Sequence, residues 1–292
     1  ERKMIAAFFL LLTAFASVRA LPTCTLTCDA GKTCYSKAAP AQDCMQSMPF
    51  NIEWAQNTLD VLQQSMENFG FDALYHETGP PYSISLDVQG SLATALTKVN
   101  DGSFTNDFAF QEYVQTIFTT TLDAHTRYSK PKCYSATFTQ PFAFDLQIIP
   151  DASNPLNQEP RLFLMENLYL DKYSTVFSAD DLGFNVNDVI GKEVVLLNGI
   201  EFTSEIIAWG DTHETRSNNR GVRFNAALRS YLYRSAISYN IDGLTDLTVT
   251  TVDGVTYTFP WLAVYTQGLG DTAYCVDAAP TETVASSKRK SP

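Results

Sequence analysis

The stretch Leu122-Asp123-Ala124-His125-Thr126-Arg127-Tyr128 stands where the character of the sequence changes. Before it, apolar residues recur every three or four positions, which is typical of helices; after it, short apolar runs are separated by turn residues, which is typical of strands. His125 lies at this junction with Asp123 two residues before it, and a catalytic histidine needs rigid support of this kind. A histidine beside Asp and Thr can also be a capping or surface residue, so the stretch alone leaves both interpretations open.

Three helices are predicted before this junction. The first begins at Ile52 after the N-cap Asn51 and ends near Gly70. The second runs from about Ser91 to Asn100, and the third from near Asn106 through Phe118. Residues 50–122 are therefore expected to be mainly helical.

Residues 134–262 are expected to be mainly strand, with one short helix at Phe202–Trp209. Two dipeptides, Asn198-Gly199 and Asp253-Gly254, are strong signals for tight turns between strands. The predicted strands are Ser135–Gln140, Phe142–Ile149, Arg161–Leu168, Glu193–Ile200, Thr245–Val252 and Val255–Phe259.

The beginning of the chain carries a signal of secretion. Residues 1–20 combine basic residues, an apolar run from Ile5 to Val18 and the small-residue site Val18-Arg19-Ala20, which predicts a signal peptide cleaved after Ala20. No other run is long enough to cross a bilayer, so no membrane association is expected after cleavage.

The net charge of −12 excludes nucleic acid as a natural partner. Residues 281–292 are small and polar, and disorder is expected there.

An even number of cysteines in a secreted chain predicts disulfides. Four of the six fall in the leader, residues 21–49, and the other two are expected to pair with each other or with the leader. Zinc binding is rejected because the spacing lacks a nearby histidine. The cysteines are Cys24, Cys28, Cys34, Cys44, Cys133 and Cys275.

Together with the opening stretch, Asn106-Asp107-Phe108-Ala109-Phe110-Gln111 resembles the front end of the tail-specific (C-terminal processing) serine peptidases, in particular the branch of the chlamydial protease-like activity factor. The resemblance covers roughly residues 50–265. It implies that His125 is the general base of a Ser-His-Glu arrangement. Phe184 to Ile200 also resembles the Gly-Asp-x-Ile…Asn-Gly signature of PDZ-like domains, except that Asn187 stands where glycine is common.

The resemblance implies an α+β chain: a helical cap at residues 50–130, ending at the candidate catalytic histidine, then a β-rich PDZ-like domain at residues 134–265, and a linker and disordered tail at residues 266–292. The α/β catalytic core with the nucleophile is not recognisable. No Gly-x-Ser-x-Gly elbow occurs. Ser129-Lys130-Pro131-Lys132 matches the spacing of the Ser-x-x-Lys motif, but its proline is incompatible with the helix that this motif needs.

Two functions remain open at this point. In the first, the chain is the front portion of a secreted serine-type peptidase that acts on a peptide or protein substrate and works with the missing catalytic core of its parent. In the second, it is a complete, non-catalytic PDZ-like binding module or pseudopeptidase. Neither function calls for a cofactor or a metal ion.

A basic stretch from Asp211 to Arg234 stands out in this acidic chain. A solvated face paired with nearby acids is the favoured interpretation. A groove that binds peptide carboxylates is the alternative, because arginine matches the geometry of carboxylates. The histidines His76 and His213 receive no role. The arginines are Arg216, Arg220, Arg223, Arg229 and Arg234.

Overall fold

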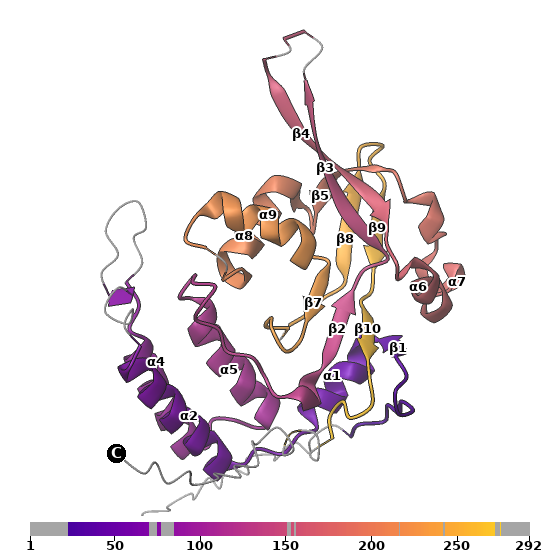
Figure 1. The fold of residues 1–292 in the computed structure, drawn as a ribbon. Coiled ribbons are helices and arrows are strands. Elements are labelled where there is room, and N and C mark those ends of the chain that lie inside the picture. The colour runs from indigo at the N-terminus through magenta and orange to yellow at the C-terminus, as the bar shows by residue number, and fades with distance from the viewer. Residues whose placement is uncertain are drawn as a thin grey trace, which may run out of the picture.

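The computed structural model describes residues 23–69, 75–76, 85–150, 153–154, 156–215, 217–241, 243–271 and 275. The fold is α+β, with a helical part on one side and two antiparallel sheets on the other (Figure 1). The predicted signal peptide and most of the predicted disordered tail lie outside the described residues. Within the described residues, no helix is long and apolar enough to cross a bilayer.

The helical part confirms the three helices predicted before the junction. They are α2 (Ile52–Glu67), α4 (Val88–Asn100) and α5 (Asp107–Thr119). Each begins after a side chain that accepts a backbone N–H of its first turn, namely Asn51, Asp87 and Asn106, which is the usual way to satisfy these donors. Their apolar faces form one core whose fully buried members are Leu59, Val88, Leu92, Ala95, Val99 and Val114.

The smaller sheet joins the two ends of the described chain. Its order is β1-β10-β2-β7, with β1 at Cys34–Lys37, β10 at Leu262–Tyr265, β2 at Ala136–Thr139 and β7 at Tyr233–Ser235. Helix α1 (Ala38–Gln46) follows β1 directly and packs its buried face against this sheet. The cysteine-rich leader, which showed little periodicity, is therefore an integral part of the fold.

The larger sheet has the order β3-β4-β5-β8-β9, and the short β6 pairs with β5. Strands β3 and β4 form a long hairpin that projects beyond the body of the sheet (Figure 1). The predicted Asn198-Gly199 turn is present, with φ of 51° and 77°, as a two-residue hairpin turn requires. The strands are β3 (Phe142–Pro150), β4 (Gln158–Glu166), β5 (Glu193–Leu197), β6 (Ile200–Glu201), β8 (Leu247–Thr251) and β9 (Thr256–Phe259).

The expectation of a single short helix after residue 134 is wrong, because the described residues there form four α-helices as well as the strands. The predicted helix at Phe202–Trp209 is α8 and continues to His213. The other three are α6 (Leu170–Val176), α7 (Ala179–Leu182) and α9 (Arg220–Ser230), and 3-10 turns lie at Lys132–Tyr134 and Val186–Asp188. Helix α9 packs on α8 through Ala227. It was not predicted because its three arginines interrupt the apolar pattern in the sequence.

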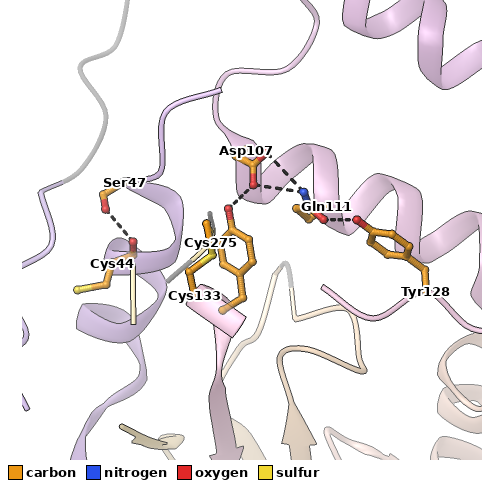
Figure 2. Close-up of a disulfide and its surroundings, with 8 residues drawn as sticks. Cys44, Ser47, Asp107, Gln111, Tyr128, Cys133 and Cys275 are labelled. Atoms are coloured by element: carbon orange, nitrogen blue, oxygen red, sulfur yellow. Dashed lines mark hydrogen bonds between the residues drawn. A yellow bond between two sulfur atoms is a disulfide. The ribbon is translucent and has the colours of Figure 1, made fainter. Parts of the chain in front are cut away.

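All six cysteines form disulfides. The leader is closed by Cys24–Cys44 and Cys28–Cys34. Cys133 pairs with Cys275, one of the two alternatives that the sequence left open. Figure 2 shows this bridge close to Asp107 at the beginning of α5. The Asp107 carboxylate accepts a hydrogen bond from the hydroxyl of Tyr134, the residue after Cys133. The bridge therefore ties the C-terminal part of the chain to the junction between the helices and the sheets.

Candidate functional site

His125 and Asp123 form a side-chain pair in the loop that follows α5. Asp123 Oδ1 lies 3.1 Å from His125 Nδ1 and also accepts the His125 backbone N–H at 2.9 Å. A carboxylate on Nδ1 selects the tautomer that carries its proton there, which leaves Nε2 as the acceptor. The imidazole is therefore set up as a base with a carboxylate behind it.

The second oxygen of Asp123 is held from the opposite side. Oδ2 accepts hydrogen bonds from the Tyr75 hydroxyl at 2.8 Å and from Thr126 Oγ1 at 3.3 Å. Burial works against the charged form, but the hydrogen bonds from His125 and Tyr75 outweigh it and hold the pKa of Asp123 below its ordinary value. Asp123 is thus ionised at neutral pH and fixed by partners on both oxygens.

The backbone around this pair is held as firmly as the carboxylate. Leu122 ends the helical segment with a φ of 52°, a left-handed conformation that is rare for leucine. Thr126 is buried, and its N–H donates to the Asp123 carbonyl at 3.2 Å. An unusual backbone conformation persists only where the surroundings impose it. Here the turn places His125 on the surface and its supports inside.

The His125 side chain is 90% exposed, and in the described residues Nδ1···Asp123 is its only side-chain hydrogen bond. No serine or cysteine of the described residues donates to Nε2. Serine-hydrolase chemistry needs a nucleophile, a base, a group that orients the base and an oxyanion hole. Of these four, the described residues show only an imidazole and a carboxylate that orients it, His125 and Asp123. The resemblance implies a glutamate as the orienting acid of a Ser-His-Glu arrangement, whereas here Asp123 contacts Nδ1 of His125.

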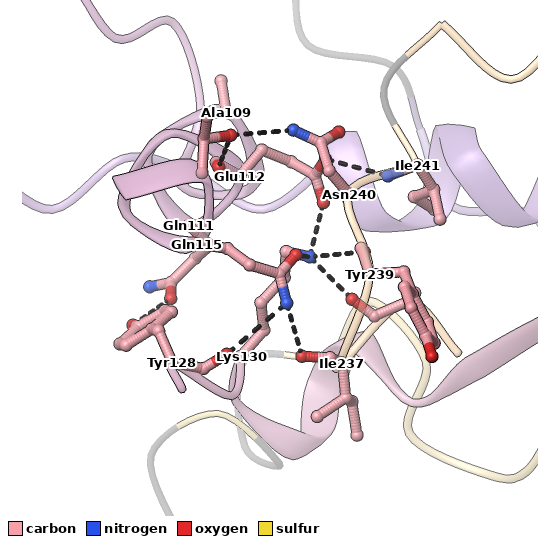
Figure 3. A network of polar contacts seen from close by, with 12 residues as sticks. Ala109, Gln111, Glu112, Gln115, Tyr128, Lys130, Ile237, Tyr239, Asn240 and Ile241 are labelled. Atoms are coloured by element: carbon pink, nitrogen blue, oxygen red, sulfur yellow. Dashed lines mark hydrogen bonds and ion pairs between the residues drawn. The ribbon is translucent and has the colours of Figure 1, made fainter. Parts of the chain in front are cut away.

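A buried ion pair anchors the segment that follows His125. Lys130 Nζ lies 2.6 Å from Glu112 Oε1 of α5, and the lysine side chain is fully buried (Figure 3). Nζ also donates to the backbone carbonyls of Ala236 at 2.7 Å and Tyr239 at 2.9 Å, and to the side chain of Gln115. Burial lowers the pKa of Lys130, and Glu112 opposes this shift.

Gln115 completes the anchor. Its amide donates to the Ile237 carbonyl at 3.0 Å, and the Lys130 N–H donates to the same carbonyl at 3.1 Å. The His125 loop is therefore fastened to α5 on one side and to the segment after β7 on the other. Sequence reasoning missed Tyr75 and Lys130, because both act across long separations in the chain and no local pattern marks them.

A groove of about 390 Å³ lies between strand β3 and helix α9. On the strand side it is lined by the consecutive residues Phe142, Ala143 and Phe144. On the helix side it is lined by Asn225, Leu228 and Arg229. Strand β3 is the edge of the larger sheet in the described part of the chain, so one row of its backbone groups has no strand partner. Exposed edges of this kind can pair with an extended peptide.

The basic stretch divides into two groups. Arg220 is exposed and pairs with Asp211, and Arg229 is exposed, as the solvated-face interpretation expects. Arg223 is instead buried, with NH2 2.6 Å from Asp211 Oδ1, and Arg234 lies among aromatic rings. A uniformly solvated face is therefore wrong, because α9 turns part of the stretch inward. Arg216 lies outside the described residues.

His213, which received no role from the sequence, lies in the last turn of α8. Its ring stacks on Trp209 at a centroid distance of 4.7 Å. The remaining histidine, His76, is exposed beside Tyr75. The structure therefore brings none of the three histidines together, and no group of metal-ligating side chains occurs among the described residues.

No family profile and no curated protein matches the chain by sequence. Among solved structures, mature CPAF, the chlamydial protease-like activity factor, complexed with lactacystin is similar at 15% identity and a TM-score of 0.43, over 72% of this chain and 35% of that chain. Mature CPAF alone gives 14% identity and a TM-score of 0.42, and a CPAF mutant gives 14% and 0.43. The chain spans about a third of the length of these structures.

Proposed function

We propose that this chain is the front portion of a secreted serine-type peptidase, in which His125 is the general base. The observation that carries the proposal is the clamp on Asp123, whose two oxygens are held by His125 and Tyr75. A surface histidine with no catalytic role does not need a carboxylate that is itself fixed by buried groups. The three disulfides are consistent with an oxidising, extracytoplasmic destination.

In this proposal the nucleophilic serine and the oxyanion donors come from the catalytic core of the parent protein. His125 Nε2 takes the proton of the serine hydroxyl as its oxygen attacks the peptide carbonyl, and later gives the proton to the leaving amine. Asp123 keeps Nδ1 protonated and stabilises the imidazolium as it forms. The exposure of His125 is what docking against a core that carries the serine requires.

The test compares the chain with its full-length parent, using a serine-directed phosphonate probe and peptide hydrolysis. We expect no labelling of the chain alone, and labelling with turnover in the parent. His125→Ala should abolish turnover in the parent, and Asp123→Asn should lower kcat by about 10²-fold or more, because the amide no longer favours the working tautomer.

His76→Ala, at the other exposed histidine of the helical part, is the matched control and should leave turnover unchanged. Labelling of the chain alone would reveal a nucleophile within it. Full turnover in the His125→Ala parent would remove the base assignment.

A second candidate function, a PDZ-like peptide-binding module, is favoured by the groove between β3 and α9. An extended peptide would add a strand to the β3 edge and seat apolar side chains against Leu228. Leu228→Asp should abolish the binding of a fluorescent peptide, measured by anisotropy. Val222→Asp changes an exposed residue of the same helix that does not line the groove, and should leave binding unchanged. Equal effects of both variants would refute the groove.

A further inference from the structure

A second cavity, of about 250 Å³, lies on the other side of strand β7 from the peptide groove. Tyr233 lines the groove, whereas its neighbour Arg234 lines this cavity, because successive side chains of a strand point to opposite faces. Its walls come from α8, from the end of β5 and from the segment after β7. We call it the Arg234 cavity. Neither the base assignment nor the peptide groove makes use of it.

Arg234 is held in this cavity by rings rather than by a carboxylate. Its guanidinium carbon lies 4.6 Å from the centroid of the Trp261 ring and 5.1 Å from those of Trp209 and Tyr231. Nε donates to the Tyr231 carbonyl at 3.0 Å. No ion pair joins Arg234 to any carboxylate in the described part of the chain, and no hydrogen bond there uses its two terminal nitrogens. A guanidinium in such surroundings usually has an anionic partner.

A further donor in the wall of the cavity also has no partner. Trp209 is 7% exposed, and its buried indole Nε1 has no hydrogen-bond acceptor among the described residues. Buried indole N–H groups usually find a partner, so an orphan of this kind needs an explanation. Beside it, burial and the charge of Arg234 lower the pKa of His213 to about 4. His213 is therefore neutral at pH 7 and adds no second positive charge to the cavity.

Among the described residues of the lining the one carboxylate is Glu205, whose charge acts on Arg234 but which makes no hydrogen bond with it. Glu205 Oε1 accepts hydrogen bonds from the Tyr231 hydroxyl at 2.7 Å and from Asn198 Nδ2 at 3.1 Å. The donors Arg234 and Trp209 Nε1 thus lie beside a carboxylate that already accepts other hydrogen bonds. Its volume is below the range of drug-sized ligand sites, so it suits a single small group.

We propose that the Arg234 cavity binds a carboxylate group, which the two terminal nitrogens of Arg234 hold as a fork and Trp209 Nε1 contacts as a third donor. Planar carboxylates match the geometry of guanidinium, whereas a lysine in its place would offer only a point charge. The group belongs either to a small organic acid or to an acidic side chain of a peptide, and the chemistry at the cavity is the same for both. The proposal is independent of the function of His125.

The test follows the three indole N–H resonances by NMR as ligand is added to the whole chain at constant ionic strength, with the Trp209 signal assigned from Trp209→Phe. Acetate should shift the Trp209 signal saturably, and neutral acetamide, which has the same shape, should not. An acetylated and amidated Gly-Glu-Gly peptide forms a second arm. Tighter binding of the peptide than of acetate assigns the site to protein side chains, and the reverse assigns it to small acids.

Arg234→Lys should weaken acetate binding by at least about tenfold, roughly the loss of one charge-assisted hydrogen bond. Arg220→Lys, at an exposed position of α9 that lines neither the groove nor the Arg234 cavity, is the matched control and should bind as the wild type does. If Arg234→Lys does not fold, Trp209→Phe serves instead, with the Trp261 signal as the readout and a weakening of about fivefold expected. Equal shifts from acetate and acetamide, or unchanged affinity in a folded Arg234→Lys or Trp209→Phe variant, would overturn the proposal.

Discussion

Replacing Lys130 by methionine should destabilise the protein severely. The change removes the cation 2.6 Å from Glu112 and leaves that buried carboxylate with the Ile241 N–H as a donor but without a positive charge beside it. It also removes the donors to the carbonyls of Ala236 and Tyr239. Breaking a buried pair from one side costs about 3–5 kcal/mol, which is a large share of a total stability of roughly 5–15 kcal/mol.

Most of this loss comes from the uncompensated charge of Glu112, so removing both charges should recover it. Glu112→Leu combined with Lys130→Met should return to within about 2 kcal/mol of the wild type, because well-packed apolar replacements of buried pairs are often neutral. Lys132→Met, two residues away and exposed, should change the free energy of unfolding by no more than about 0.5 kcal/mol.

Urea unfolding, followed by circular dichroism and fitted with a common m-value, measures all four proteins. A double variant that is as unstable as Lys130→Met would refute the role of the abandoned charge. A loss below about 1 kcal/mol in the single variant would show that the pair is dispensable, since that is within the range of surface ion pairs.

Three further predictions concern other parts of the fold. Gly270→Ala should destabilise the protein by more than the roughly 1–2 kcal/mol that a left-handed alanine costs, because its Cβ would lie 2.3 Å from a backbone carbonyl oxygen of α1. Gly102 has a similar φ and open space around it, so Gly102→Ala should show only the left-handed cost in thermal unfolding. Cys133→Ser should cost about 2–5 kcal/mol in urea, and adding Cys275→Ser should cost little more, because the bridge is already lost. Burial opposes the ionised form of Asp211, but two arginines hold its pKa below the ordinary value. The stabilising effect of Asp211 is therefore present above the ordinary carboxylate pKa and is lost as the pH falls through the pKa of the folded state. Asp211→Asn should consequently show a smaller acid-induced drop in Tm than the wild type.

The parts of the fold that were predicted from the sequence are those whose causes are local. Helices α2 and α5 follow from an asparagine cap and a regular apolar stripe, both visible within a dozen residues. Helix α9 was not predicted, because the burial of Arg223 depends on Asp211, which lies twelve residues earlier in the chain and outside the helix. Strand β1 was missed for the same reason, since four residues become a strand only beside β10.

The same distinction applies to the candidate site. Asp123 and His125 could be proposed together because an aspartate two residues ahead can reach the backbone and side chain of the histidine. The supports could not be proposed: Tyr75 reaches Asp123 from a segment with no recognisable pattern, and Lys130 looks in the sequence like one of many surface lysines. Which polar residues become buried is decided by the packing of distant elements.

The pairing of β1 with β10 has a consequence for the protein as it is being synthesised. β1 emerges early from the ribosome, but its partner lies near the end of the described chain. At 5–20 residues per second, the delay is on the order of ten seconds or more. During that time the leader can form its own two short-range disulfides but not its sheet contacts. A nascent chain stalled before Leu262 should therefore keep the leader open to proteases and chaperones, and the release of β10 is the event that closes it.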